Sequence, residues 1–270
     1  MIQGTIHGLF YLQLLLTFAA GSAWIYVTVY ASTHFGSKTG GFIGGLPSTA
    51  LLSFFFIGYT QSPEIASGAT TVFPLAMGVT GLFLVIFCWA VRWGFFAGLT
   101  AGILAWFLLS FIIARVRPEN FYLNILFYIL VMAFSLFVLE NKLQVRAIAG
   151  RKTDHASTHR ILRSLFGGLI ITLTVLIARI GGPLLGGIFA GFPAMFIATL
   201  TVTNRVQGTD FARAITKPLL VTSMITIALY ALSVRYLYLS AGLYNGTLLS
   251  ILVAAVSASL TFRYILPRLT

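Results

Sequence analysis

The chain has 270 residues, of which 59% are hydrophobic and 8% carry a charge. A soluble domain carries about 25% charged residues, so lipid rather than water must solvate most of this surface. The formal net charge of +12 would suggest nucleic acid in a soluble protein. Here the basic residues lie at the ends of apolar runs, where they indicate membrane topology, and we predict no nucleic-acid partner. One cysteine and four histidines give no disulfide framework and no metal site.

Nine apolar runs follow one another along the chain, and each is long enough to cross a bilayer as a helix of about 20 residues. The runs are too long and too apolar for the alternating strands of a membrane barrel. The sequence therefore predicts an all-α polytopic membrane protein with about nine transmembrane helices. The predicted helices cover approximately residues 8–32, 41–59, 65–90, 94–115, 120–140, 161–180, 183–203, 210–236 and 242–265.

The basic residues are divided unequally between the two sides that nine crossings create. Four of the 17, namely Arg115, Arg117, Arg179 and Arg235, fall on one side, and the other thirteen fall on the opposite side. The positive-inside rule places the larger group in the cytoplasm. We therefore expect a protein of the cell membrane with its N-terminus outside, and with its C-terminus and the basic loop 141–160 in the cytoplasm.

An internal repeat relates the two halves of the chain. Residues 36–47 and 182–193 align without a gap at an offset of 146, and both segments are rich in glycine and end in proline. The same offset pairs Gln61 with Gln207, Glu64 with Asp210, and Ala66 with Ala212. The predicted helices 94–115 and 242–265 align at an offset of 148.

The repeat divides the chain into four parts. These are a first four-helix repeat (1–116), a linker transmembrane helix (117–140), the basic cytoplasmic loop (141–160) and a second four-helix repeat (161–270). Because the linker adds one crossing, the second repeat is predicted to be inverted relative to the first. Inverted repeats of this kind are the architecture of many secondary transporters.

The second repeat also resembles a known family. Residues 190–198 read AGFPAMFIA, and residues 207–214 read QGTDFARA. This pattern of a glycine turn, a Phe-Pro pair, an apolar helix and then glycine, an acid and Ala-Arg is similar to that of the small four-helix GlpM-like membrane proteins. The first repeat is similar at 44–49 and 63–66, although Leu46 replaces the phenylalanine and Ser67 the arginine. The resemblance implies two fused copies of a four-helix ancestor, but no activity.

Two prolines inside predicted helices mark the candidate site. Pro47 and Pro193 each remove a backbone hydrogen bond, and bilayer lipid offers no replacement. Paired helix breaks at corresponding positions are typical of a transporter site. The alternative is close helix packing alone, because the glycines have Gly-x-x-x-Gly spacing. The predicted solute or ion path comprises Gly44, Gly45, Pro47, Ser48, Thr49, Ser53, Gly187, Gly191, Pro193 and Thr199.

Two acids, Glu64 and Asp210, precede apolar helices at equivalent positions of the repeats. In both places an acid stabilises the positive end of a helix dipole. The alternative is a gate or ion-coupling carboxylate. The inverted arrangement places the two on opposite faces of the membrane, so they cannot share a proton as a catalytic pair does.

These observations favour a transporter-like protein that moves a small solute or ion between the inverted repeats. No nucleotide loop, nucleophile motif or cofactor motif is present, so we expect neither an enzyme nor a bound cofactor. The expected partners are membrane lipids, the unidentified solute and further copies of the chain. An ion channel and a non-transporting scaffold or accessory subunit are the alternatives. Topology accounts for the positive charge, which therefore gives no anion preference.

Overall fold

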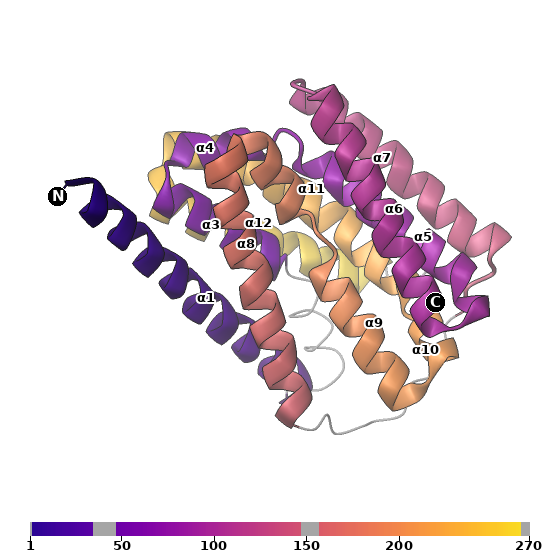
Figure 1. Ribbon diagram of the computed structural model, residues 1–270. Coiled ribbons are helices and arrows are strands. Elements are labelled where there is room, and N and C mark those ends of the chain that lie inside the picture. The colour runs from indigo at the N-terminus through magenta and orange to yellow at the C-terminus, as the bar shows by residue number, and fades with distance from the viewer. Residues whose placement is uncertain (1, 35–46, 147–156, 266–270) are drawn as a thin grey trace.

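The expected all-α membrane fold is confirmed by the computed structural model, which describes residues 2–34, 47–146 and 157–265 (Figure 1). These residues form helices and no strand. Seven helical stretches among them are long and apolar enough to cross a membrane, and Thr49–Thr60 is a shorter apolar helix. The longest stretch, Ser164–Arg205, contains two of the predicted helices, and backbone breaks divide it.

In the first half, the described residues form five α-helices and one short 3₁₀ turn. They are α1 (Ile2–His34), α3 (Ser48–Thr60), α4 (Pro63–Ala69), α5 (Phe73–Ala90), the 3₁₀ turn Val91–Trp93 and α6 (Phe95–Val116). The single helix predicted over 65–90 was wrong, because the chain breaks between Ala69 and Phe73. Pro74 explains the break: it has no amide hydrogen to donate, and it stands in the first turn of α5, where none is needed.

The second half begins with α7 and contains the same kind of interruption. Its elements are α7 (Phe121–Phe137), a π-helical turn (Val138–Lys142), α8 (Ser157–Ala190), α9 (Ala194–Gln207), α10 (Thr209–Ala214), α11 (Thr216–Ser240), α12 (Gly242–Leu260) and a second π-helical turn (Thr261–Ile265). The helix predicted over 210–236 is divided at Ile215 into α10 and α11. Pro218 in the first turn of α11 has the role that Pro74 has in α5.

The predicted boundary between residues 180 and 183 is a kink rather than a loop. Gly182 has φ 70° and ψ −166° inside α8, and Pro183 follows it. Only glycine adopts this conformation without strain. The chain then breaks a second time at Gly191–Pro193, which separates α8 from α9.

Backbone features recur at the offset of the sequence repeat. Pro47 and Pro193 each cap the next helix with φ −75°. The Thr70 hydroxyl donates to the Ser67 carbonyl (2.6 Å), and the Thr216 hydroxyl makes the equivalent bond to Arg213 (2.7 Å). Each half therefore contains a long helix preceded by a short one, with the same threonine bond at the junction.

Helices at equivalent places in the two halves lie antiparallel. Near the start of α1, the Phe10 ring packs under the Arg179 guanidinium (4.2 Å), whereas Ile25, further along, packs on Gly167. The order of the α8 residues is thus opposite to that of α1. Likewise Cys88, at the end of α5, lies 3.1 Å from Thr216, at the start of α11.

The centre of the bundle is formed by α5, whose span is 72% buried, against 22% for α6. Helices α1 and α8 lie together on one side of the bundle, and α6 and α7 lie on the other (Figure 1). Between them, aromatic side chains of α3, α5 and α11 pack together, and the Phe54 ring meets Phe73 edge-on at 5.0 Å. The outward faces of α6 and α7 are apolar and exposed, as expected of a lipid-facing surface.

We expect Gly168→Ala to destabilise the protein, because a Cβ atom there would lie 2.9 Å from backbone atoms of Phe18 and Ser22. Overpacking of this kind costs about 1–3 kcal/mol. Gly78→Ala is the matched control: its Cβ would meet nothing closer than 3.5 Å, and alanine favours a helix by about 1 kcal/mol. Thermal unfolding in detergent should lower the Tm of the first variant and not of the second. If both variants had the Tm of the wild type, the close contact between α1 and α8 at Gly168 would be contradicted.

Candidate functional site

The helix break at Gly191–Pro193 is held by a buried hydrogen-bond chain. The Thr80 hydroxyl on α5 donates to the Gly191 carbonyl (2.7 Å), and it accepts a bond from the Trp106 indole on α6 (3.0 Å). Trp106 and Thr80 are completely or almost completely buried. A carbonyl that the broken helix leaves without an amide donor is thereby satisfied, as it must be within lipid.

Two glycines of the predicted path are packed against backbone and side-chain atoms of α4 and α5. A Cβ atom at Gly187 would lie 2.0 Å from the Ala69 carbonyl oxygen, and one at Gly191 would lie 2.6 Å from the Ala76 Cβ. Both positions therefore require glycine for close helix approach. Their part in a solute path stays a prediction.

The other predicted path residues are spread over α3 and α9. Pro47 and Ser53 are buried, whereas Thr49 and Thr199 are half-buried. Ser48 begins α3, but its side chain lies outside the described part of the structure, as do Gly44 and Gly45 entirely. Helix α3 packs on α8 and α4, whereas α9 packs chiefly on α10 and the end of α8. The two sets of residues thus have different neighbours.

The two equivalent acids are exposed in the first turns of short helices. Glu64 lies in the first turn of α4, where the Ser62 hydroxyl caps the helix by accepting a bond from the Ile65 amide (3.3 Å). A hydrogen bond with the Ser62 side chain lowers the pKa of Glu64. Asp210 is in the first turn of α10. Their positions fit stabilisation of the helix dipole, while a gating role stays a prediction.

One polar cluster surrounds the break between α4 and α5, and we call it the Arg235 junction (Ser67, Thr70, Thr71, Asn124 and Arg235). Ser67 donates to the Arg235 carbonyl (2.8 Å), and the Arg235 guanidinium donates to the Thr71 hydroxyl (3.0 Å). Asn124 of α7 donates to the Thr71 carbonyl (2.7 Å). The guanidinium also lies 4.5 Å from the centre of the Phe121 ring, a cation–π contact.

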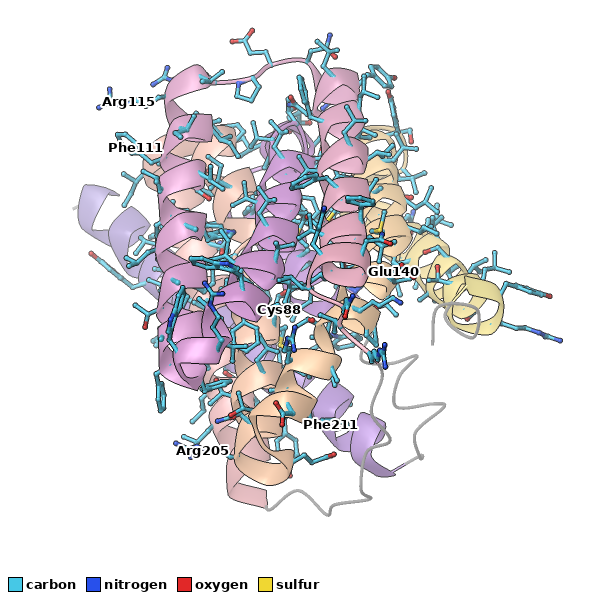
Figure 2. The ribbon with its side chains drawn as sticks, turned by 90° about the vertical axis from the view of Figure 1, so that its right-hand side faces the viewer. Cys88, Phe111, Arg115, Glu140, Arg205 and Phe211 are labelled. Atoms are coloured by element: carbon cyan, nitrogen blue, oxygen red, sulfur yellow. The ribbon has the colours of Figure 1, made fainter. Side chains whose placement is uncertain are left out.

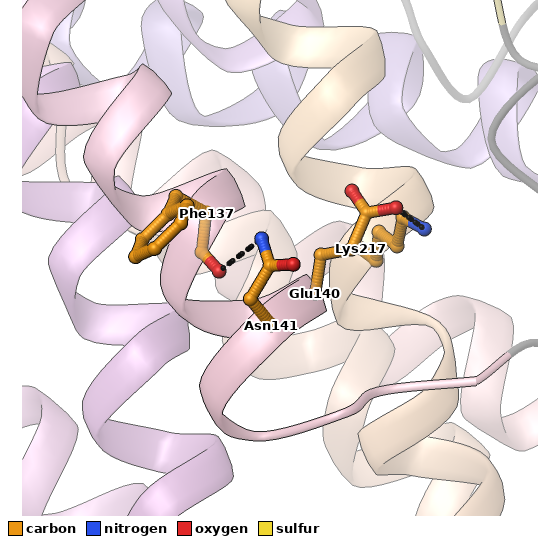
Figure 3. A network of polar contacts seen from close by, with 4 residues as sticks. All are labelled: Phe137, Glu140, Asn141 and Lys217. Carbon is orange, nitrogen blue, oxygen red and sulfur yellow. Dashed lines mark hydrogen bonds and ion pairs between the residues drawn. The ribbon is translucent and has the colours of Figure 1, made fainter.

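A second polar cluster surrounds the break between α10 and α11 at the opposite end of the bundle, and we call it the Arg213 junction (Cys88, Glu140, Arg213, Thr216 and Lys217). The Arg213 guanidinium donates to the Leu143 carbonyl (2.5 Å). Lys217 and Glu140 form an ion pair with a 3.5 Å N–O distance, and Asn141 beside it donates to the Phe137 carbonyl (Figure 3). Figure 2 shows Cys88 toward the Arg205 end of the molecule and Arg115 at the other end.

Within the described part of the chain, neither arginine of these junctions has a carboxylate partner. Among the residues that the structure describes, Lys217–Glu140 is the one ion pair. The Nε atom of Arg213 is buried without a hydrogen-bond partner. Each end of the bundle therefore has a guanidinium group whose charge no described acid neutralises.

A stripe of hydroxyl groups on α11 and α12 was missed by the sequence analysis. The buried face of α11 carries Thr216, Ser223, Thr226, Tyr230 and Tyr238, and α12 faces it with Thr247, Ser250 and Ser257. The sequence does contain a signal, because hydroxyl residues recur at steps of three, four, seven and eight along α11, which places them on one helix face. The signal was missed because these hydroxyl residues lie within an otherwise apolar run, which was interpreted only as a membrane-spanning helix.

A groove of about 650 Å³ lies between the outer faces of α11 and α12 and the turn that follows α12. Leu229, Val256, Leu260 and Tyr264 are among its lining residues. This apolar lining suits a lipid chain rather than a polar solute. The described residues contain no group of three or more His, Cys, Asp or Glu side chains that could hold a metal ion.

Comparison with known families places a match on the second half of the chain. Residues 160–266 are similar to the family described as "Protein of unknown function (DUF3147)". The matched stretch covers almost all of the predicted second repeat, 161–270. Comparison with the curated proteins and with the solved structures found no match.

We expect Thr80→Val to destabilise the protein although the two side chains have similar shapes. The substitution leaves the Trp106 N–H and the Gly191 carbonyl buried without partners, at about 1–3 kcal/mol each. Thr174→Val is the matched control, because the buried Thr174 hydroxyl bonds only to the Ile170 carbonyl of its own helix. Denaturant titration should show a loss for Thr80→Val well above that of the control. A similar loss in both variants would mean that the Thr80 bonds do not hold the break.

Proposed function

We propose that this multi-pass helical membrane protein is a carrier, in which two inverted copies of a GlpM-like four-helix unit expose a solute site to each side of the membrane in turn. The observation that carries the proposal is the equivalence of the two junctions. Their Thr70–Ser67 and Thr216–Arg213 bonds are 146 residues apart in the sequence and lie at opposite ends of the bundle.

The antiparallel course of equivalent helices supports the inverted duplication. Helices α1 and α8 cross at Gly21 and Gly167, two residues that are also 146 apart. The family match to residues 160–266 adds support, since it covers one repeat without the other. In transporters with inverted repeats, the two sides open alternately by movement of one repeat against the other.

The linker helix α7 contacts both halves. Asn124 donates to the Thr71 carbonyl in the first half, and Tyr128 donates to the Met224 carbonyl in the second (2.8 Å). Thr70 and Thr216 are both completely buried, so both junctions are closed in this structure. We therefore assign it to an occluded state, from which either junction opens while the other stays closed.

The positive-inside rule assigns the sides of the membrane. It places the Arg213 junction, with Lys217 and the nearby Lys142, at the cytoplasmic face of the cell membrane. The Arg235 junction, near Arg115 and Arg117, then faces outward together with the N-terminus.

A non-transporting scaffold is the second candidate, and the packed break at Gly191 is the observation that favours it. The Thr80–Trp106 bond chain fills the space beside the break, which leaves Gly191 no access to solvent. A carrier must open elsewhere, at the two junctions, whereas a scaffold has no need to open at all.

Cysteine accessibility separates these functions without knowledge of the solute. In a Cys88→Ser background, we expect Thr70→Cys to react with a membrane-impermeant thiol reagent added outside, and Thr216→Cys with the same reagent added to inside-out vesicles. In the double variant Thr70→Cys/Thr216→Cys, a bulky label at one position should slow reaction at the other by about tenfold or more, because it traps one state. Thr174→Cys, buried in α8, should react from neither side.

The alternatives give different patterns. A scaffold predicts that Thr70→Cys and Thr216→Cys are as unreactive as Thr174→Cys. A channel predicts that both react and that a label at one does not slow the other. Reaction of Thr216→Cys from the outside would contradict the proposed topology.

A further inference from the structure

The apolar groove between the outer faces of α11 and α12 has the length of one bilayer leaflet. Its lining includes Ile225 and Leu229 of α11, and it extends along α12 from Leu252 to Tyr264 in the turn that follows. At the helical rise, residues 252–264 span about 18 Å. Half of a hydrocarbon core measures about 15 Å. A single acyl chain that enters at the end of α12 therefore matches the groove in length.

An arginine lies at the end of this groove. Leu252, Val256 and Leu260 line it, and Arg263 continues their series, with steps of four, four and three residues along one helix face. The exposed Arg263 guanidinium lies 5.7 Å from the centre of the Tyr264 ring, which also lines the groove. It forms no ion pair with any acid in the described part of the chain. The apolar groove thus ends beside a positive charge that is available to a negative group.

Arg263 lies at the end of the bundle that contains the Arg213 junction. Helices α11 and α12 are antiparallel neighbours, and the turn after α12 contacts α11. The topology proposed above places this end in the cytoplasm. The cytoplasmic leaflet of a cell membrane carries anionic lipids, and basic groups between helices on that side bind their head groups. Arg263 therefore faces the leaflet in which anionic phospholipids are most abundant.

The equivalent face in the first half of the chain is covered by protein. At the offset of 146, Ile225 and Leu229 correspond to Val79 and Phe83. The exposed fraction is 38% for Ile225 and for Leu229, but 8% for Val79 and 0% for Phe83. Val79 packs in a cluster with side chains of α6 and α8. The groove is thus a surface that the fold covers in one half and that the described residues leave open in the other.

Charge decides between three candidate occupants of the groove. A second copy of the chain that docks symmetrically would bring its own Arg263 to the same depth, where the like charges repel. Residues 36–46 are the sequence equivalents of 182–192, which cover Val79, but they contain Lys38 and no acid. A phospholipid has an apolar chain and a phosphate, and arginine binds phosphate through two parallel hydrogen bonds. Of the three, the lipid alone supplies a partner for both parts of the site.

We infer that this groove binds one acyl chain of an anionic glycerophospholipid from the cytoplasmic leaflet, with the lipid phosphate on the Arg263 guanidinium. A net negative head group is favoured because a zwitterionic one already balances its phosphate with its own ammonium group. The site is separate from the two junctions at which the proposed carrier opens. The inference therefore holds for a carrier and for a scaffold alike.

The test is the Tm of the purified full-length protein in detergent, with increasing amounts of phosphatidylglycerol or of phosphatidylcholine with the same acyl chains. We expect phosphatidylglycerol to raise the Tm of the wild type in a saturable way, and phosphatidylcholine to do so with lower affinity. Arg263→Gln should weaken the apparent affinity for phosphatidylglycerol about fivefold or more. Arg115→Gln is the matched control, because Arg115 is the exposed equivalent of Arg263 at the offset of 148; it should keep the wild-type affinity.

A second pair of variants tests the groove itself. Val256→Trp places a large side chain in the groove and should remove most of the Tm rise that phosphatidylglycerol causes. Leu108→Trp, at the equivalent position on the outward face of α6, should keep that rise. Both native side chains are exposed, so neither variant should lower the Tm in the absence of lipid.

Three results would overturn the inference. The first is an equal rise of the wild-type Tm with both lipids. The second is an equal loss of affinity in Arg115→Gln and Arg263→Gln, which would indicate a general attraction of anionic lipid to a positive protein. The third is a lower Tm of Val256→Trp without lipid, together with no effect of phosphatidylglycerol on the wild type. That result would mean that protein fills the groove, either a second copy of the chain or residues 36–46.

Discussion

A helix that breaks inside a bilayer leaves backbone groups that lipid cannot satisfy, and this constraint organises the bundle. At Gly191 the protein meets it with the Thr80 hydroxyl, whose orientation is fixed in turn by the Trp106 indole. One carbonyl thereby sets the relative positions of α5, α6 and the boundary between α8 and α9. The glycines around it serve the same end, because Gly187 and Gly191 let α8 approach the backbone of α4 and the start of α5.

The two halves solve the same structural problem with different side chains. Each has a short helix, a break and a long helix with a proline in its first turn, and a threonine hydroxyl at the break bonds to the carbonyl three residues earlier. Where the first half has Trp106 and a paired Thr80, the second has Ala254 and an unpaired Thr226.

Much of the fold follows from the sequence, because apolar runs of about 20 residues have few alternatives in lipid. The division of the basic residues between the two sides of the membrane stays a prediction. The structure places the Lys217–Glu140 ion pair at one end of the bundle and the bonds of Arg235 and Asn124 to Thr71 at the other. The breaks at Thr70 and Ile215 were missed, although Pro74 and Pro218 lie nearby. Each proline, which follows the acid of its half by ten or eight residues, was interpreted as part of one continuous helix, whereas it lies in the first turn of a second helix.

The hydroxyl stripe of α11 and α12 has the spacing of one helix face, but the sequence does not show which of its hydroxyl groups have hydrogen-bond partners. A threonine or serine in an apolar helix usually bonds to the carbonyl four residues earlier, as Thr174 and Thr201 do. Thr80, Thr226 and Thr174 therefore look alike in the sequence. Their differences arise from neighbours distant in the chain, and only the packed structure shows which hydroxyls have partners.

The most direct test of the central claim is a pair of distance measurements between spin labels in lipid nanodiscs, in a Cys88→Ser background. One pair joins Glu64→Cys to Leu239→Cys at the Arg235 junction, and the other joins Asp210→Cys to Trp93→Cys at the Arg213 junction. These pairs occupy equivalent positions, and all four residues are exposed. The inverted-repeat carrier predicts that each pair shows two distances, a short one when its end of the bundle is closed and a long one when it is open. A change of conditions that increases the long-distance population of one pair should decrease it in the other. A single unchanging distance at both ends would contradict it.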